Sequence, residues 1–555
     1  MHTAMPIGID DFKEAREGYY IVDKTSFLSR FFPGHPKVTL ITRPRRFGKT
    51  MTLSMLRYFF DCEGAEEHRK LFDGMAVSQD TALMKEMGTR PVLFFSMRGW
   101  KATDWDAMQE TITNGLQQVA QQHKYLLQSN RVDPADRQFL QRMYDGSAPI
   151  SSLRTAPARL LQMLEAHDGK KAVFLLDEYD VPIQSAWEHG YYDEAIDFFR
   201  AFLTTSLKSN LSLDFAVLTG VLRISKESIF SDLNNLDVDS ILHPKYPTVL
   251  GFTSEEVEKI ADDLGRADRL PELREWYDGY RIAGHEIYNP WSVVKYFDRE
   301  CQPETYWVNT SGNAILGEML HRAVRKTLDA LQSLIQGGSI RASLSDEYIY
   351  SDIFKNKNVL YAMLLATGYL TTKTLRSTEL GLQAELILPN RELRSIFRIE
   401  VLERYQSDEA DIEIPELMQA FVDGDIETVQ EGLSEYLVLL TSSFDAAKGR
   451  EAFYHGFVLG MTAVLTEDYV IRSNRESGYG RYDIAATPKD TSRPGFIIEC
   501  KLAEPGESLE DKADLALRQI EEKHYDAELV REGVKVIHRY GIAFSGKKLC
   551  AKIAE

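Results

Sequence analysis

Residues 38–50 read VTLITRPRRFGKT. The apolar run VTLIT predicts a short buried strand, and the stretch MTLSMLRYFF at 51–60 predicts a helix with one apolar face. At such a junction backbone N–H groups cradle phosphate oxygens, while Lys49 can reach the β- and γ-phosphates and the Thr50 hydroxyl can ligate Mg²⁺. The sequence therefore predicts a nucleotide-binding loop. Its candidate residues are Arg45, Arg46, Phe47, Gly48, Lys49 and Thr50.

An acidic strand supplies the partner that such a loop needs. Residues 173–178 read VFLLDE, an apolar strand with two carboxylates at its carboxyl end, where open α/β sheets bind ligands. Asp177 is placed to hold Mg²⁺, and Glu178 to polarise the attacking water. The alternative is a buried strand with solvated acids beside a chance Gly-Lys-Thr, but the two patterns together favour an ATPase. Asp180 can orient the loop, but the sequence favours a role as the N-cap of the next helix.

A third strand is expected at 215–219 (FAVLT), followed by the residues GVLR. This strand has the form of one that ends beside the γ-phosphate. Thr219 is then a candidate to sense the phosphate, and Arg223 a candidate to stabilise the charge of the transition state. A surface role fits Arg223 equally well, because nothing in the sequence fixes where its side chain points.

The composition is that of an ordinary protein of several domains. The 555 residues are 44% apolar and 27% charged, and at ~150 residues per domain they make three or four domains. The four scattered cysteines, Cys62, Cys301, Cys500 and Cys550, have no paired spacing, which favours a reducing compartment. The chain opens without an apolar secretory segment, and no stretch approaches the ~20 apolar residues of a membrane span. We therefore expect a cytoplasmic protein without a membrane partner.

The charge of the chain is uneven along its length. Lys and Arg number 65 against 84 Asp and Glu, a formal net charge of −19. Residues 1–60 hold ten basic and five acidic side chains, and residues 451–555 hold 15 and 18, so most of the acid lies in the middle. An acidic average gives nucleic-acid binding no support, but it does not exclude it.

The pattern of expected strands and helices predicts an α/β fold in several parts. Strands at 38–42, 92–96, 172–176 and 215–219 alternate with helices, which is typical of a mainly parallel sheet. From 252 the helix-start signature FTSEEVEKIADDL opens a helical region, and from about 448 a helix, three strands, a helix and a strand follow. The expected parts are a core at 1–250, a helical lid at 251–305, a helical middle region at 306–445 with a short strand-rich patch near 369–388, and a small α/β domain at 446–555.

The last domain carries a second group of chemical residues. Residues 481–501 read RYDIAATPKDTSRPGFIIECK, with Asp483 inside one expected strand and Glu499 and Lys501 at the end of the next. Since strand side chains alternate between faces, Glu499 and Lys501 point the same way and Cys500 points into the core. Two carboxylates that hold Mg²⁺ and a lysine that offsets phosphate charge are what metal-dependent phosphodiester cleavage needs. A positioning role suits Lys501 better than a role as base, because nearby acids keep it protonated.

Several of these motifs resemble a known family. RPRRFGKT, FLLDEYD and LTGVLRISKESIFSDLNNL resemble the AAA-ATPase-like family, which is related to archaeal-type and Orc-like P-loop ATPases. The opening PIGIDDFKEAREGYYIVDKTSF is similar to that family's N-terminal segment, so the resemblance covers about residues 5–300. It implies an ATP-binding core followed by a helical lid. The usual loop of the family is GPRRxGKT, and Arg43 in place of Gly is the main departure.

The C-terminal pattern D-x15-E-x-K on adjacent strands resembles the PD-(D/E)XK nuclease superfamily. This resemblance implies a nuclease fold, and Gln519 matches the helper glutamine of some branches. The superfamily often adds an acid from its first helix, for which Glu451 and Glu476 both remain open. His455 is expected to be a packed core histidine, because one histidine without a spaced companion makes a poor metal site.

Together these features predict a P-loop ATPase core with a parallel sheet, a helical lid, a helical middle region and a small α/β PD-(D/E)XK nuclease-like domain. The expected cofactors are ATP and Mg²⁺, the expected partner is DNA or RNA, and the sequence also allows a homo-oligomer. The leading hypothesis is an ATP-regulated nuclease. One alternative is an ATP-switched signalling or scaffold protein with a catalytically silent nuclease fold. Another is a remodelling ATPase that uses the nuclease-like domain as a tether.

Overall fold

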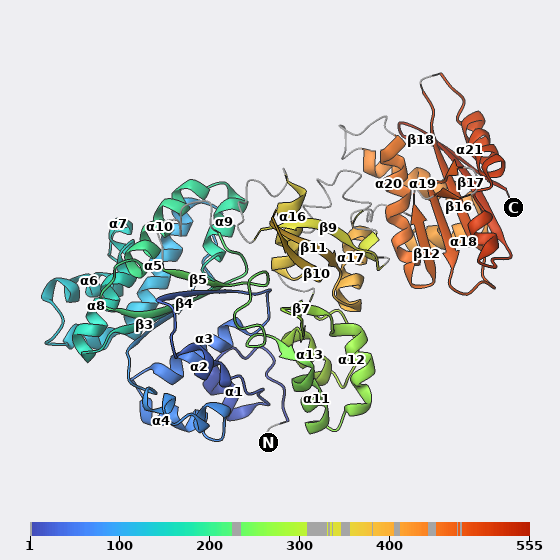
Figure 1. Ribbon diagram of the computed structural model, residues 1–555. Coiled ribbons are helices and arrows are strands. Elements are labelled where there is room, and N and C mark those ends of the chain that lie inside the picture. Colours follow the sequence, from blue (N-terminus) through green and yellow to red (C-terminus); the bar gives the residue numbers. More distant parts are fainter. Residues whose placement is uncertain are drawn as a thin grey trace. The chain divides into compact units, whose positions relative to one another are not determined.

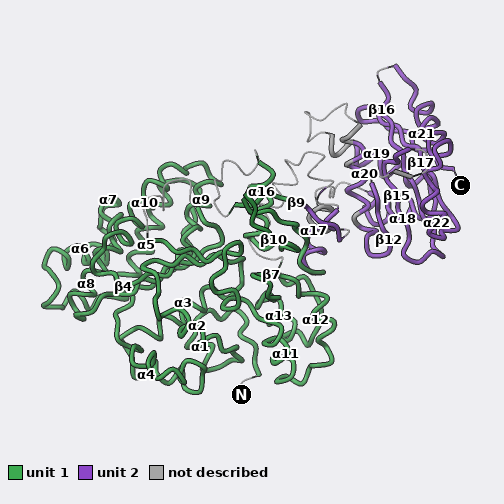
Figure 2. The backbone as a smooth tube through the Cα atoms, viewed as in Figure 1, with its two compact units in different colours: residues 1–307, 341–391 green, residues 308–340, 392–555 purple. Residues whose placement is uncertain are grey.

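The structure, a computed structural model, divides into two compact units (Figure 2). Unit 1 comprises residues 1–307 and 341–391, and unit 2 comprises residues 308–340 and 392–555. The middle region expected at 306–445 is therefore shared between the units. The residues that the structure describes are 3–224, 235–307, 330, 333–335, 337–345, 356–379, 381–403, 411–441, 451–473, 476–477, 480–504 and 506–554.

A five-stranded parallel sheet forms the centre of unit 1 (Figure 1). Its order is β2-β3-β4-β1-β5, and every neighbouring pair is parallel. The sheet confirms the four strands expected from the sequence and adds a short edge strand, β5, that was not expected. The strands are β1 (Val38–Thr42), β2 (Val92–Ser96), β3 (Ala172–Asp177), β4 (Leu213–Gly220) and β5 (Leu236–Asp239).

Helices cover both faces of this sheet. Every residue of β1 and β3 is buried, which requires a layer on each side, and α3 and α8 both contact β3. The helices of this region are α1 (Phe12–Gly18), α2 (Ser26–Phe31), α3 (Lys49–Phe60), α4 (Ala65–Arg69), α5 (Trp105–Gln122), α6 (Pro134–Tyr144), α7 (Ile150–Leu153), α8 (Ala156–Asp168), α9 (Val181–His189) and α10 (Tyr192–Leu207).

The region expected to be a helical lid also contains strands. Its helices are α11 (Ser254–Asp263), α12 (Leu270–Tyr277) and α13 (Pro290–Asp298). Between them lies a small antiparallel sheet of order β6-β8-β7, formed by β6 (Phe252–Thr253), β7 (Tyr280–Ile282) and β8 (His285–Tyr288). The start signature of α11 is confirmed as a capping box, in which Thr253 and Glu256 each bond to the backbone N–H of the other.

The start of the chain packs against this region. Met5 and Tyr20 belong to the same apolar core cluster as Val257 and Tyr277, and the Tyr20 hydroxyl donates to Asp263 at 2.7 Å. A further three-stranded sheet of order β10-β11-β9 confirms the strand-rich patch expected near 369–388. It comprises β9 (Ile340–Leu344), β10 (Thr371–Thr378) and β11 (Gly381–Ile387), with α16 (Lys357–Thr367) before β10.

Unit 2 has a mixed five-stranded sheet of order β12-β15-β16-β17-β18. The pair β16-β17 is parallel and the other three pairs are antiparallel. Its strands are β12 (Tyr469–Ser473), β15 (Ile484–Pro488), β16 (Gly495–Leu502), β17 (Ile537–Ser545) and β18 (Lys548–Ala554), with a short pair β13 (Glu476–Ser477) and β14 (Gly480–Arg481). Its helices are α17 (Arg391–Glu403), α18 (Ile414–Asp423), α19 (Ile426–Thr441), α20 (Glu451–Met461), α21 (Leu509–Lys523) and α22 (Ala527–Arg531).

The two faces of this second sheet are covered by different helices. On one face Ile497 of β16 packs in a core cluster with Ile520 of α21. On the other face Phe496 stacks against Phe421 of α18, with ring centroids 5.6 Å apart. Since alternate residues of β16 face opposite sides, Glu499 and Lys501 lie on the side of α21.

Candidate active sites

The loop at 43–50 joins β1 to α3, as the sequence predicts. Gly48 precedes α3 with a backbone φ of +85°, a left-handed conformation that glycine adopts without a Cβ penalty. The Lys49 side chain folds into the loop, and its Nζ donates to the carbonyl oxygens of Arg43 at 3.0 Å and Pro44 at 2.8 Å. Burial lowers the pKa of Lys49, while the charges of Glu178 and Asp177 oppose that shift. The ammonium therefore sits inside the loop with acids close by.

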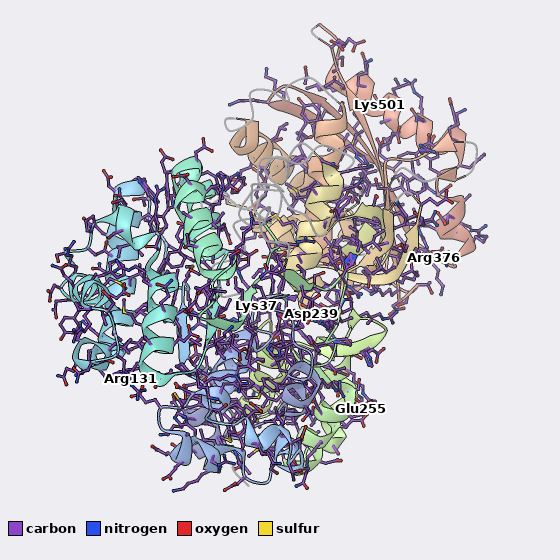
Figure 3. The ribbon with its side chains drawn as sticks, turned by 60° about the vertical axis from the view of Figure 1, so that its left-hand side comes forward. Lys37, Arg131, Asp239, Glu255, Arg376 and Lys501 are labelled. Carbon is purple, nitrogen blue, oxygen red and sulfur yellow. The ribbon has the colours of Figure 1, made fainter. Side chains whose placement is uncertain are left out.

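Arg43 is an internal anchor of the loop. Its side chain is fully buried, and its Nη2 bonds both carboxylate oxygens of Asp239 at 3.0 and 3.1 Å. Its Nη1 donates to the backbone carbonyls of Thr42 and Asp239. Asp239, labelled in Figure 3, ends the edge strand β5. Arg43, which stands where the family's loop usually has glycine, thus holds β5 against β1.

We expect Arg43→Gly, which restores the usual glycine, to destabilise unit 1 by about 3–5 kcal/mol, because it leaves the Asp239 carboxylate buried without its cation. Scanning calorimetry of the intact chain should show a lower melting temperature. Adding Asp239→Asn to this variant should recover part of the loss, since the unpaired charge is removed. Equal melting temperatures for Arg43→Gly and the wild type would contradict the anchoring role.

Residues 45–47 of the loop are held by contacts with elements outside the parallel sheet. The Phe47 side chain is buried and meets the Tyr280 ring edge to face at 5.2 Å, and its carbonyl accepts from Gly251 N at 3.0 Å. The guanidinium of Arg46 lies 4.0 Å from the Trp291 ring centroid. Arg45 donates to Gln184 at 3.4 Å. The candidate nucleotide contacts of residues 46 and 47 are therefore backbone N–H groups, since the side chains of Arg46 and Phe47 pack against the 251–291 region.

The Asp177 carboxylate, at the end of β3, accepts hydrogen bonds from three hydroxyl side chains. Its carboxylate is buried and accepts from Thr50 Oγ1 at 2.7 Å and from Thr219 Oγ1 at 2.5 Å. Ser96, its register partner on β2, donates to it at 3.3 Å. The two expected Mg²⁺ ligands, Thr50 and Asp177, are thus brought together. The hydroxyl of Thr219 contacts Asp177, and its contact with phosphate stays a prediction.

Glu178 follows directly after β3 and is half-buried. Its backbone φ of +53° is uncommon for a residue with a side chain, and such strain is concentrated at functional sites. Burial raises the pKa of Glu178, the charge of Asp177 adds to that rise, and Arg98 opposes it. Arg98, whose Nε donates to Glu178 at 3.3 Å, carries no motif in the sequence. The only sequence signal for Arg98 is its place just after the strand expected at 92–96.

Asp180 orients the next loop and does not cap α9. Its side chain makes no capping hydrogen bond, and its Oδ2 accepts from the backbone N–H groups of Val221 and Leu222 at 2.8 and 2.9 Å. The helix-cap role favoured from the sequence is therefore wrong, because the side chain is turned toward the segment that follows β4. That segment carries Arg223, which lines a small pocket with Thr42, Val221, Ser240, Ile241, Leu242, Leu365 and Ala366.

In unit 2, Glu499, Lys501 and Gln519 form one hydrogen-bonded group. Glu499 Oε1 accepts from Lys501 Nζ at 2.8 Å and from Gln519 Nε2 at 2.7 Å. Gln519 comes from α21, which approaches β17 closely because Gly541, beside Glu499, has no Cβ to meet the Ala513 carbonyl. Lys501 is labelled in Figure 3.

Asp483 lies between two short strands, where the sequence predicts a strand interior. The ladder of β15 and β16 ends at Ile484, and beyond it the carboxylate of Asp483 accepts the backbone N–H of Cys500 at 2.8 Å. The side chain thus replaces a ladder bond and holds Asp483 beside Glu499. His455 is buried as expected, and its Nε2 lies 3.1 Å from the carbonyl oxygen of Asp483.

The chemistry of this group fits a divalent cation. Glu499 Oε2 is buried without a hydrogen-bond partner in the structure, and carboxylate oxygens are the ligands that Mg²⁺ prefers. Within the described residues, no cluster brings three or more His, Cys, Asp or Glu side chains together as metal ligands. The side chains of Glu451 and Glu476, the two open candidates for a further acid, lie outside the described residues. Asp483 and Glu499 are therefore the acids that would hold the cation.

Cation binding in unit 2 should strengthen as the pH rises. Burial, with the nearby charge of Asp483, raises the pKa of Glu499 to about 7. A proton on Glu499 competes with the metal, so the affinity for Mn²⁺ should rise about tenfold between pH 6 and pH 8, as Glu499 loses its proton. Calorimetric titration of the intact chain measures this rise. Glu499→Gln should bind Mn²⁺ weakly and without that slope, and an equal slope in both proteins would assign the titration elsewhere.

Comparison with known proteins assigns a family to each of the two segments that carry these candidate sites. Residues 6–230 match the family model described as a predicted AAA-ATPase, and residues 449–553 match that of the PD-(D/E)XK nuclease superfamily. The chain thus carries an AAA-ATPase-like domain and a C-terminal PD-(D/E)XK nuclease superfamily domain, as its motifs predict. It is also similar to the uncharacterized protein in the vnfD 5′ region of Azotobacter chroococcum mcd 1. The two are 27% identical over 559 residues, with 98% of this chain and 96% of that one covered.

Among the described residues, no helix combines the length and the apolar character that a bilayer span requires.

Proposed function

We propose that this chain binds and hydrolyses ATP in unit 1 and cleaves DNA or RNA with Mg²⁺ in unit 2. The observation that carries the proposal is the 2.7 Å contact between Thr50 of the 43–50 loop and Asp177 of the acidic strand. These residues are 127 positions apart, and their contact supports a shared role as the Mg²⁺ ligands that nucleotide hydrolysis needs. The hydrogen-bonded group of Glu499, Lys501 and Gln519 supports the proposed nuclease activity, because the fold brings these residues together from β16 and α21.

In the ATPase site the residues take distinct roles. Lys49 and the backbone N–H groups of the loop bind the β- and γ-phosphates, and Thr50 with Asp177 would hold Mg²⁺. Glu178 orients and polarises the attacking water. The cation supplies charge for the phosphate oxygens when it is bound.

In the nuclease site Asp483 and Glu499 would hold the cation, which activates water and offsets phosphate charge. Lys501 stabilises the charge that develops on the scissile phosphate. Gln519 fixes the Glu499 carboxylate through its hydrogen bond of 2.7 Å. One observation favours the alternative, an ATP-switched protein with a silent nuclease fold: the described residues bring two carboxylates to this site but not the further acid that the superfamily often adds.

The intact protein decides between these functions. ATP turnover is measured with MgATP, and cleavage of single- and double-stranded DNA and RNA is measured with Mg²⁺ or Mn²⁺, with and without ATP. Turnover together with metal-dependent cleavage supports the proposal. Turnover without cleavage of any of these substrates supports the silent fold. Light scattering with and without ATP measures whether the chain forms the homo-oligomer that the sequence allows.

A further inference from the structure

Arg98 contacts Thr50 and Glu178 of the ATPase site and also Asp10 near the start of the chain. Its Nη1 donates to Asp10 at 2.7 Å, its Nε to Glu178 at 3.3 Å and its Nη2 to Thr50 Oγ1 at 3.2 Å. The guanidinium therefore lies against both the residue expected to polarise water and the residue expected to ligate Mg²⁺. A positive charge at this point faces the place where hydrolysis concentrates negative charge.

The backbone of Arg98 is fixed while its side chain is accessible. Met97 N donates to the Asp177 carbonyl at 2.9 Å, and Arg98 N donates to Ser96 Oγ at 3.2 Å, so the sheet sets where the side chain starts. The Arg98 side chain is 56% exposed, and its partner Asp10 is 51% exposed. Exposed ion pairs contribute little free energy, so the guanidinium can exchange carboxylate partners for phosphate at small cost.

The other candidate arginine lies on a different side of the loop. Arg223 lines its pocket with Thr42 at the end of β1, with Ser240 just beyond β5 and with Leu365 of α16. Glu178 follows β3, and β4 lies between β3 and β1 in the sheet. The contacts of Arg98 with Glu178 and Thr50 therefore favour Arg98 over Arg223 as the source of charge for the reaction.

We propose that Arg98 is a catalytic residue that binds the γ-phosphate in the transition state, and that Asp10 and Glu178 hold it when no nucleotide is bound. This inference rests on the proposed ATPase function. Water adds to the γ-phosphorus while the bond from that phosphorus to the β–γ bridging oxygen breaks. The electron pair of the broken bond leaves on ADP, and the proton of the water passes to Glu178 and from there to solvent. The planar guanidinium pairs with the phosphoryl oxygens that carry the developing charge. By exchanging partners, it also releases Glu178 to act on the water.

The test compares Arg98→Ala, Arg98→Lys and the matched surface control Arg131→Ala in the intact chain with MgATP. Arg98→Ala should lower kcat by about 10²–10³-fold, while the Kd for ATP changes less than about threefold, because the contact strengthens only in the transition state. Its affinity for ADP with aluminium fluoride should fall in parallel with kcat. Arg98→Lys should recover little, because an ammonium lacks the planar fork. Arg131, which is exposed and donates to the His167 carbonyl, should tolerate alanine without a change in either constant.

Chemical rescue separates catalysis from structural support. Guanidinium ion added to Arg98→Ala should restore part of kcat, since the small cation can occupy the vacated position. A wild-type rate in Arg98→Ala would overturn the role of Arg98 and leave the ATPase proposal standing. Loss of ATP binding together with kcat, without rescue, would also overturn it, because Arg98 would then serve the structure of the loop. A wild-type chain that binds ATP but never hydrolyses it would instead overturn the proposed function itself.

Discussion

Lys49→Ala is expected to abolish ATP binding by the intact chain. The Lys49 ammonium lies inside the 43–50 loop on the carbonyl oxygens of Arg43 and Pro44, where the phosphates of a nucleotide would meet it. Loss of a buried charge-assisted contact of this kind costs about 2.7 kcal/mol or more, which is at least about 100-fold in Kd. Isothermal calorimetry with MgATP measures this loss.

Glu178→Gln should separate binding from turnover. The amide keeps the shape of the side chain and leaves Thr50 and Asp177 in place, so the Kd for ATP should stay close to that of the wild type. Turnover should fall by about 10²–10⁴-fold, because the water loses its polarising carboxylate.

Lys124→Ala, which removes an exposed lysine from the same unit, is the charge-matched control for Lys49→Ala. Equal ATP affinity in the wild type and Lys49→Ala would contradict the assignment of residues 43–50 as the nucleotide-binding loop.

The second large effect is expected in unit 2. Glu499→Gln removes the charge that would hold the cation, and Lys501→Ala removes the charge that would face the scissile phosphate. Each should lower single-turnover cleavage by about 10²–10³-fold. Gln519→Ala should cost less, about 10–100-fold, because Gln519 only supports Glu499 through a hydrogen bond. The measurement is cleavage of labelled duplex and single strands with Mn²⁺.

Lys548→Ala is the matched control for Lys501→Ala, because it removes an exposed lysine from β18, at the edge of the same sheet. It should cleave at the wild-type rate. Unchanged cleavage in Glu499→Gln would place the active site elsewhere. Cation binding by the wild type without cleavage of any substrate would point to the silent fold.

Strands made of uniformly apolar residues could be predicted from the sequence with their bounds. β1 and β2 have the bounds expected from their apolar runs, 38–42 and 92–96, since a buried strand has one simple signature. β5 was not predicted because LDVD is half acidic, and Asp239 is buried there in an ion pair with Arg43. β18 (KLCAKIA) has lysines at 548 and 552 among its apolar residues, as suits an edge strand, and its apolar signal is too weak to stand out.

The candidate site residues also differ in whether a local sequence motif reveals them. Lys49, Thr50, Asp177 and Glu499 could be found because local motifs fix both their residue type and their spacing. Arg98 belongs to no motif, and its contact with Glu178 exists only because the sheet places β2 beside β3. The role of Asp180 was mistaken for the same reason. Its position at the start of a helix is local information, whereas its bonds to Val221 and Leu222 depend on which strand lies next to β3.

The support of the 43–50 loop by distant residues decides how much of the chain a working fragment must contain. A fragment ending at residue 250 would keep the whole Gly-Lys-Thr motif and the five-stranded sheet. It would lose Gly251 and Tyr280, leaving the Phe47 ring exposed to water and the Phe47 carbonyl without its donor. Tyr280 in turn donates to the Gly368 carbonyl at 2.9 Å, and Gly368 lies against Pro44. A fragment ending at residue 250 would therefore bind nucleotide more weakly than the intact chain. The shortest fragment that retains the contacts of Gly251, Tyr280 and Gly368 with the loop extends beyond Gly368.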